Sequence, residues 1–278
     1  MRRWVIAGAG ALVWMAAASP SGAADIPAAP VVKAPVRVPA SQSWYGFYIG
    51  VHGGYGWGRS AIEYTPDAFY APLFLAAGAP RSGADNPKGF LGGITYGSNW
   101  QFDRIVLGTD SDFSFTDIKA SQTFNGAVGG IPFTSNASQR LSWFGTTRLR
   151  GGFLLGDHIL LYGTGGLANG RAESTTTNNV TIAGGCLIPG ACAVGSGSKN
   201  MWGWAAGGGV EVANGPWQFR VEYLRYDLGT LSYTMRDLVV PLNFINASVR
   251  VNGDMVRGAI TYRFNWTPLG LIFGTDRI

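Results

Sequence analysis

The most constraining feature of this sequence is an alternation of side chains with a period of two residues, which recurs along most of the chain. From 45 to 58 the odd positions carry bulky apolar side chains such as Tyr45, Ile49 and Trp57, while most even positions are glycine. Successive side chains of a β-strand point to opposite faces of the sheet. The pattern therefore predicts a strand with one bulky apolar face and one small face.

Seven further segments repeat this pattern, at 90–102, 105–115, 140–153, 159–171, 201–212, 217–228 and 256–266. In 159–171 several glycines hide the phase, so the pattern predicts a strand without assigned faces. In 217–228 the apolar set changes phase, from Val221 and Tyr223 to Leu224, Tyr226 and Leu228, and we expect a β-bulge near Tyr223. Eight strands are predicted in total.

The segments between these strands alternate in length. Tight turns are predicted at 102–104, 155–157 and 214–216. Long loops rich in Ser, Thr, Asn, Gly and Pro are predicted at 59–86, 117–138, 173–198 and 232–252. Short periplasmic turns and long extracellular loops are typical of outer-membrane barrels. The sequence thus predicts an all-β fold, an eight-stranded antiparallel transmembrane β-barrel over 44–266.

The composition indicates which face meets lipid. Charged residues make up only 13% of the chain, against about 25% in typical soluble domains. A face exposed to water would carry many Lys and Glu residues, whereas the face opposite the bulky set carries mainly Gly, Ala, Ser and Thr. Small side chains suit the narrow lumen of an eight-stranded barrel. The alternative is a secreted β-sandwich with an aromatic core.

Aromatic residues fall near the predicted strand ends, where a membrane barrel carries girdles at the lipid headgroups. The predicted girdle comprises Trp44, Tyr45, Trp57, Trp100, Trp143, Trp202, Trp217 and Trp266.

Charged residues on the opposite face are expected to point into the lumen. They are Asp110, Asp112, Arg140, Arg148, Arg150, Glu211, Arg220, Glu222, Arg225, Asp227, Arg257 and Arg263. Charges in such an interior must be paired or hydrated. They would form either a structural network that plugs the lumen or an ion path, and the small strand number favours the plug.

The N-terminal region carries an export signal. Arg2 and Arg3 precede an apolar run, Trp4 to Ala18, and small residues follow, so a signal peptide over 1–23 is predicted, with cleavage after Ala23. A membrane anchor is the alternative, but a spanning helix needs about 20 apolar residues. Residues 24–43 are expected to form a Pro/Ala-rich periplasmic tether, and 267–278 a C-terminal periplasmic extension.

The chain has two cysteines, Cys186 and Cys192. An exported protein meets an oxidising compartment, so we expect a disulfide that closes a small loop. A metal site is disfavoured because no His or third Cys lies nearby.

Five motifs stand out along the predicted strands: 93–101 (GITYGSNWQ), 142–151 (SWFGTTRLRG), 160–168 (LLYGTGGLA), 207–211 (GGGVE) and 221–229 (VEYLRYDLG). Together they resemble the porin-family outer-membrane immunogenic proteins of alphaproteobacteria, small barrels that are similar to the OmpA transmembrane domain. The resemblance covers 44–266. It implies an abundant surface protein of the bacterial cell outer membrane that supports envelope integrity and meets the host or the surroundings.

Such a protein would contact outer-membrane lipid and lipopolysaccharide, the barrel-insertion machinery and, through its loops, a surface or host partner. Family barrels usually end in an aromatic residue that the insertion machinery reads, whereas here 267–278 follows Trp266. We expect no enzymatic activity, no cofactor or metal and no nucleic-acid partner. A narrow porin-like diffusion channel for small solutes is the alternative function.

One predicted loop segment, 68–80, is unusually apolar for an exposed loop, with Phe69, Tyr70, Leu73, Phe74 and Leu75. It is expected to form either a structural lid over the barrel mouth or a surface that binds a partner.

Overall fold

Ten β-strands, an α-helix and a short 3-10 helix make up the parts of the chain that the computed structural model describes, residues 42–181 and 185–268. The predicted signal peptide, the predicted tether up to residue 41 and the predicted extension from residue 269 lie outside these residues. The elements are β1 (Gly46–Trp57), β2 (Ser60–Pro66), α1 (Tyr70–Ala76), β3 (Ser82–Asp85), β4 (Lys88–Phe102), β5 (Ile105–Val128), β6 (Ile131–Leu155), β7 (Ile159–Val180), η1 (Gly185–Leu187), β8 (Cys192–Asn214), β9 (Trp217–Asp237) and β10 (Phe244–Arg263). No helix in the described part of the chain is long and apolar enough to cross a membrane.

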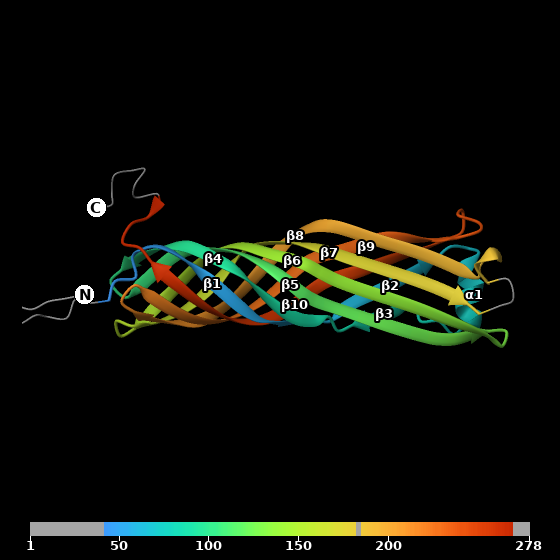
Figure 1. The fold of residues 1–278 in the computed structure, drawn as a ribbon, viewed down its shortest axis with the longest axis horizontal. Helices are drawn as coiled ribbons and strands as arrows, with labels where there is room; N and C mark the ends of the chain where they lie inside the picture. The colour runs from blue at the N-terminus through green and yellow to red at the C-terminus, as the bar shows by residue number, and fades with distance from the viewer. Residues whose placement is uncertain (1–41, 182–184, 269–278) are drawn as a thin grey trace, which may run out of the picture. The chain divides into compact units, whose positions relative to one another are not determined.

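Eight of the strands close into a ring. Their order is β1-β4-β5-β6-β7-β8-β9-β10, all neighbours are antiparallel, and β1 also pairs with β10 (Figure 1). Hydrocarbon offers no hydrogen-bond partners, so a membrane-spanning sheet must pair all its edges. The ring meets this requirement and confirms the predicted eight-stranded antiparallel barrel. The two short strands β2 and β3 extend the wall on the extracellular side of β1. There β2 pairs with the N-terminal part of β10, and β3 pairs with β2.

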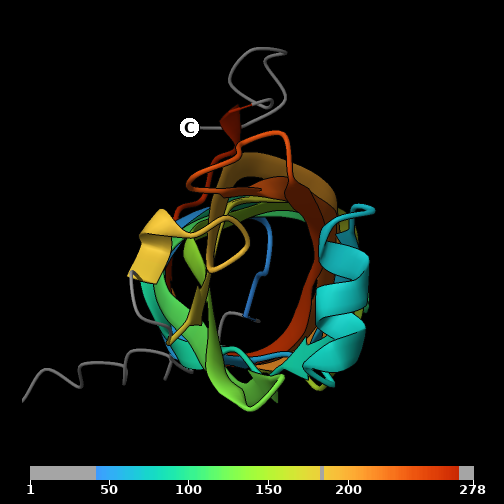
Figure 2. The same ribbon diagram turned by 90° about the vertical axis from the view of Figure 1, so that its right-hand side faces the viewer.

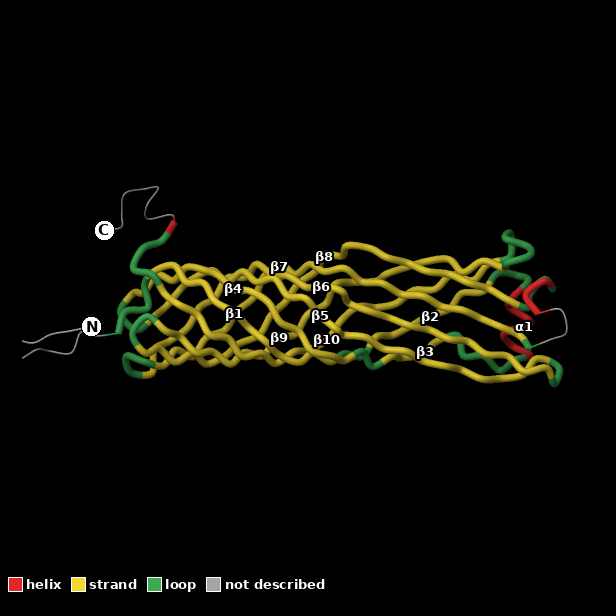
Figure 3. The backbone as a smooth tube through the Cα atoms, viewed as in Figure 1, coloured by secondary structure: helices red, strands yellow, loops and turns green. Residues whose placement is uncertain are grey.

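The two ends of the barrel differ, as Figure 1 and Figure 3 show. One end carries three tight turns, between β4 and β5, β6 and β7, and β8 and β9, together with the first and last described residues. The other end carries α1, η1 and the connections between β5 and β6, β7 and β8, and β9 and β10, whereas the β1–β2 and β3–β4 connections lie part-way along the wall. With the usual orientation of such barrels, the first end is periplasmic and the second extracellular.

Three of the four predicted long loops are wrong in extent. Most of 117–138, 173–198 and 232–252 is strand, and β5 and β6 reach 24 and 25 residues. A two-residue turn joins them, in which Gly129 and Gly130 both have positive φ angles, 57° and 82°. Glycine adopts such angles without a steric penalty, and a turn of this kind continues the strand pairing directly. The fourth loop, 59–86, contains β2, α1 and β3.

The apolar residues change face where the strands leave the membrane, and β9 shows this clearly. Val221 and Tyr223 point outward with 63% and 44% of their surface exposed, whereas Leu224, the next residue, is 0% exposed. The strand alternates regularly through this point, so the predicted bulge near Tyr223 is wrong. Beyond the bilayer the outer surface meets water and the interior must be filled, so apolar side chains belong on the inside.

This change of face also corrects several assignments of charged and apolar residues. Arg140, Arg225 and Asp227, which we predicted to point inward, lie on the outer surface. Leu141, predicted to face outward, is buried inside. On β6 the pairing register with β7 shifts between Leu141 and Trp143. Such an irregularity interrupts the alternation of inward and outward side chains at this point.

An arginine placed on the outer surface should reveal where the bilayer lies. Val221→Arg, in the lipid-facing part of β9, should lower the free energy of unfolding by about 2 to 4 kcal/mol. Ser232→Arg on the same strand also faces outward, but beyond the apolar band, and should change stability by less than about 1 kcal/mol. Denaturant unfolding in lipid vesicles measures both. Equal losses would contradict the proposed membrane boundary.

Candidate functional site: the lumen network and the outer cap

Eight charged side chains meet inside the barrel, each less than a tenth exposed. They are Asp110 and Asp112 on β5, Arg148 and Arg150 on β6, Glu211 on β8, Arg220 and Glu222 on β9, and Arg257 on β10. All occupy inward positions of the alternation. We call these eight residues the lumen network, and its four arginines balance its four carboxylates.

Arg148 lies at the centre of the network. Its Nη1 donates to Glu222 Oε2 at 3.0 Å, and its Nη2 donates to Asp112 Oδ2 at 3.1 Å. Arg257 bridges the same two carboxylates, with Nη2 to Asp112 Oδ2 at 2.8 Å and Nε to Glu222 Oε1 at 2.7 Å. β5 and β9 lie on opposite sides of the ring, so these side chains span the lumen.

A second set of contacts joins more strands to the network. Arg150 Nη2 donates to Glu211 Oε2 at 2.6 Å, and Arg220 donates to Asp110 and to Thr95 Oγ1. The network therefore contacts β4, β5, β6, β8, β9 and β10. Removing one partner from a buried ion pair typically costs about 3 to 5 kcal/mol, because it leaves the other charge unpaired.

Two tyrosines complete the network and were not predicted. Tyr48 donates to Asp110 Oδ2 at 3.1 Å, and Tyr162 donates to Glu222 Oε2 at 2.9 Å. The Arg150 guanidinium carbon also lies 4.2 Å from the centroid of the Tyr162 ring, a cation–π contact. Tyr48 occupies an inward position in the sequence pattern, which would have been a usable signal. Tyr162 lies in the strand whose faces could not be assigned.

Apolar layers fill the lumen on both sides of the network. Toward the periplasmic end, Trp44 is completely buried with Val106, Leu154 and Leu160. Its Nε1 donates to the Asp157 carbonyl oxygen at 3.0 Å. The assignment of Trp44 to the girdle is therefore wrong. The residue precedes β1, so the strand alternation does not govern it, and its ring closes this end of the barrel.

Toward the extracellular end, a larger layer of buried apolar side chains lies inside the barrel. It comprises Leu91, Ile118, Leu141, Phe144, Ala168, Ala172, Met201, Ala205, Leu224, Tyr226, Leu228, Leu231, Val251 and Met255.

The remaining predicted residues of the lumen and the girdle lie as follows. Arg263 is largely buried but stands apart from the network, donating to the Tyr45 carbonyl oxygen at 2.8 Å. Trp57, Trp202, Trp217 and Trp266 are exposed on the outer surface, whereas Tyr45, Trp100 and Trp143 are half-buried. The ring centroids of Trp266 and Phe47 lie 5.6 Å apart in a stacked arrangement, and those of Tyr55 and Phe90 lie 5.2 Å apart. Aromatic rings therefore gather near both edges of the apolar band.

The apolar segment 68–80 contains α1, which lies at the extracellular end (Figure 2). Tyr70 and Phe74 are buried against inward side chains of β2, β8, β9 and β10. Asp67 accepts hydrogen bonds from the Phe69 and Tyr70 amides at the start of the helix and from the Phe244 amide at the start of β10. These contacts favour the lid interpretation, although Leu75 stays exposed.

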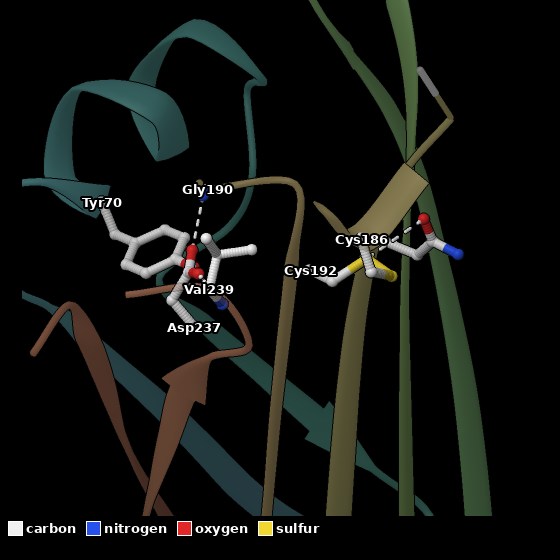
Figure 4. Close-up of a disulfide and its surroundings, with 7 residues drawn as sticks. Tyr70, Cys186, Gly190, Cys192, Asp237 and Val239 are labelled. Atoms are coloured by element: carbon white, nitrogen blue, oxygen red, sulfur yellow. Dashed lines mark hydrogen bonds between the residues drawn. A yellow bond between two sulfur atoms is a disulfide. The ribbon is translucent and has the colours of Figure 1, made fainter. Parts of the chain in front are cut away.

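One carboxylate joins three connections at this end. Asp237 accepts hydrogen bonds from Tyr70 Oη at 2.7 Å, from the Gly190 amide at 2.5 Å and from the Val239 amide at 2.7 Å (Figure 4). It also accepts one from the Val240 amide at 2.9 Å. Burial raises the pKa of Asp237, but these hydrogen bonds outweigh burial and hold the pKa below its ordinary value. We call α1, 185–191 and 238–243 together the outer cap.

Cys186 and Cys192 are joined by a disulfide (Figure 4). The bond closes the segment that carries Gly190, and the Cys192 carbonyl oxygen accepts a hydrogen bond from the Leu238 amide at 3.1 Å. It thereby limits the motion of one part of the outer cap. Among residues 42–181 and 185–268, no group of three or more His, Cys, Asp or Glu side chains is arranged to hold a metal ion.

Comparison with known proteins places this barrel in a family. Residues 26–264 match the family described as "Outer membrane protein beta-barrel domain". The chain belongs to this family. It is similar to the 31 kDa outer-membrane immunogenic protein of Brucella melitensis, 32% identical over 84% of this chain and 89% of that protein. It is also similar to the 22 kDa outer membrane protein of Rhizobium leguminosarum, 30% identical over 65% of this chain and 61% of that protein.

Among solved structures, the outer membrane protein OprG from Pseudomonas aeruginosa overlaps 80% of this chain and 98% of its own, with 14% identity and a TM-score of 0.41. The family and the named relatives place this barrel in the outer membrane and support the predicted resemblance to the alphaproteobacterial immunogenic proteins.

Breaking the lumen network should destabilise the barrel strongly. Arg148→Met removes a cation that contacts three carboxylates and should lower the free energy of unfolding by about 3 to 5 kcal/mol. Arg171→Met breaks an exposed pair with Glu173 and should cost less than about 1 kcal/mol. Guanidinium unfolding in micelles compares the two variants. A similar small loss in both would show that the network does not stabilise the fold.

Loss of the Asp237 carboxylate should loosen the outer cap without opening the barrel. In Asp237→Asn the amide group brings a donor toward Tyr70 Oη and the Gly190 amide, so exchange of the Gly190, Val239 and Val240 amides should accelerate roughly tenfold to hundredfold. Glu63→Gln, an exposed change on β2, is the control. Hydrogen exchange read by mass spectrometry gives the result.

Acid should reproduce the effect of Asp237→Asn. The folded-state pKa of Asp237 is lowered, so its contribution is present above the ordinary Asp value of about 3.9. It is lost as pH falls through the lower folded-state pKa. The protection factors of these amides, which correct each exchange rate for the slower intrinsic exchange in acid, should therefore fall at low pH. Unchanged protection factors, with the barrel intact, would show that the carboxylate does not hold the outer cap.

Proposed function

We propose that this protein is a closed structural barrel, which anchors a rigid outer cap at the bacterial surface, supports envelope integrity and meets the host or the surroundings there. The observation that carries the proposal is the set of arginines that reach across the lumen to carboxylates on opposite strands, Arg148 and Arg257 above all. With apolar layers on both sides, the lumen is filled by side chains rather than lined by them.

A surface role is supported by the outer cap and by the relatives. The outer cap is held by α1, by the Asp237 hydrogen bonds and by the disulfide. A surface held in one conformation loses little entropy when a partner binds. The relatives are named as outer-membrane and immunogenic proteins, and we carry this surface exposure over to the present chain.

We also propose that the barrel has no enzymatic activity. The buried carboxylates of the lumen network are engaged in ion pairs. The two histidines make structural hydrogen bonds, His52 Nε2 with Ser114 Oγ at 2.8 Å and His158 Nδ1 with the Ala213 carbonyl oxygen at 3.0 Å. His52 also lines a hollow of about 550 Å³, but the other residues that line it are mainly apolar residues and glycines and include no carboxylate or nucleophile that could act with it.

Conductance separates a closed barrel from the alternative, a narrow diffusion channel. The purified full-length protein in planar bilayers should give no reproducible conductance steps, because the lumen network closes the path for ions. A known porin in the same bilayers is the control for insertion. Regular steps that vary linearly with voltage would overturn the closed barrel and favour the channel.

The structural role is tested in cells. Deleting the gene should increase leakage of periplasmic enzymes and sensitivity to detergents, and the wild-type protein should restore both. Arg148→Met, if it reaches the membrane at reduced levels, should restore them only partly. An intact barrier in the deletion strain would contradict a role in envelope integrity.

A further inference from the structure

Three basic residues lie directly opposite one another on the outer surface of the barrel. Lys88 on β4 is the register partner of Lys119 on β5, and Lys119 is the register partner of Arg140 on β6. All three are exposed. Neighbouring strands are only about 4.8 Å apart, and like charges placed directly opposite destabilise a sheet. The row therefore has an electrostatic cost.

The acidic residues nearby leave this basic row largely unneutralised. Asp117 pairs with Lys119 at 3.1 Å, and both side chains are more than half exposed, where ion pairs are weak. Glu173 is the register partner of Arg140, but it accepts its hydrogen bond from Arg171 at 3.0 Å. In the described part of the chain, neither Lys88 nor Arg140 takes part in an ion pair.

The other side of the barrel is built differently. There Arg225 pairs with Asp254 at 3.3 Å, and Arg250 pairs with Asp227 at 2.6 Å, across β9 and β10. These two arginines are as exposed as Lys119, yet each has a carboxylate partner on the neighbouring strand. Within the described residues, the basic row on β4, β5 and β6 has no such ion pair between neighbouring strands.

The basic row lies just beyond the apolar band of the outer surface. Phe90 precedes Lys88 toward the membrane on β4, Phe115 precedes Lys119 on β5, and Trp143 precedes Arg140 on β6. Aromatic girdles lie at the level of the lipid headgroups. Long basic side chains immediately above such a girdle reach the plane of the headgroup phosphates.

A hollow in the wall accompanies the basic row. It has a volume of about 660 Å³ and is lined by Lys88, Lys119, Arg140 and by polar side chains that include Ser121, Gln122 and Ser138. It forms where β4 begins, because the outer part of β5 has no neighbouring strand paired to it on that side within the described residues. There Gln122 Nε2 on β5 donates a hydrogen bond to the Ala84 carbonyl oxygen on β3 at 2.8 Å.

Two acidic residues also line this hollow, Asp85 and Glu173, of which Glu173 accepts a hydrogen bond from Arg171. Asp85 is fully buried, and neither of its carboxylate oxygens has a hydrogen-bond partner within the described residues. Burial raises the pKa of Asp85, which favours its neutral form.

We propose that Lys88, Lys119 and Arg140 form a binding site for the phosphate groups of a phosphorylated glycolipid of the outer leaflet, the chemistry of lipid A. Phosphate oxygens accept charge-assisted hydrogen bonds from both lysine and arginine, and a headgroup with two phosphates matches a row of neighbouring cations. The site deepens the proposed role in envelope integrity and rests on it, since it couples the barrel wall to the lipid that surrounds it.

Binding of lipid A to the full-length protein tests the site. The protein, purified in detergent, is titrated with fluorescent diphosphoryl lipid A in mixed micelles. The variant K88Q/R140Q should bind about tenfold more weakly than the wild type, a loss expected when two charge-assisted contacts are removed. The matched control R225Q/R250Q removes the same charge from the self-paired side and should bind as the wild type does.

Additional variants and ligands identify what the site binds, and a folding assay excludes misfolding as the cause of weaker binding. K88R/R140K keeps both charges and should bind within about twofold of the wild type, and heat-modifiable migration on gels reports whether each variant is folded. Dephosphorylated lipid A should bind weakly, and millimolar inorganic phosphate should not displace the diphosphoryl lipid.

Four results would overturn the site. They are equal binding by K88Q/R140Q and the wild type, an equal loss in R225Q/R250Q, tight binding of the dephosphorylated lipid, and displacement by inorganic phosphate. Conductance steps, or an intact barrier in a deletion strain, would refute the proposed function while leaving these binding results unchanged, so the two failures are distinguishable.

Discussion

Closure of the sheet between β1 and β10 is the constraint on which the rest of this structure depends. In hydrocarbon an unpaired backbone amide or carbonyl costs several kcal/mol, so a sheet can cross the membrane only as a closed ring. A ring of eight strands leaves an interior that side chains just fill. Both faces of every strand are therefore constrained, the outer face by lipid and the inner face by the limited volume of the lumen.

The charged network follows from these two constraints. Because the outer face must be apolar in the bilayer, polar and charged residues of the same strands occupy the inner face. There the arginines and carboxylates come from opposite walls and neutralise one another, as Arg148 and Glu222 do. A buried ion pair adds little more to the free energy of folding than a well-packed apolar pair does. It does, however, strongly destabilise any arrangement that separates its two charges. The network thus opposes changes of strand register or ring size.

The sequence was sufficient to predict the strands in the membrane, because lipid imposes one strict alternation on them. It was misleading where the strands leave the membrane. Leu224 and Tyr226 are inward although they are apolar, since water now surrounds the outer face. The sequence alone does not locate the membrane boundary. A switch of the apolar residues from the outer to the inner face of a regular strand therefore looks the same as a β-bulge. The polar segments 117–138 and 232–252 resemble loops for the same reason.

The lumen network was only partly predictable. The inward positions of Asp110 and Arg148 follow from alternation, but their partners depend on which strands face each other across the ring. Trp44 precedes the first strand, so no periodicity applied to it. The pairing of Asp237 with Tyr70 and Gly190 joins residues far apart in the chain, and no local pattern in the sequence reports it.

That junction at Asp237 has a consequence for recognition by antibodies. The surface around it combines backbone and side chains from α1, from the disulfide-closed segment and from the connection before β10. An epitope here is discontinuous, so antibodies raised against the folded barrel would bind it and fail on blots of denatured protein. Linear peptides copied from any single segment would be poor immunogens for it.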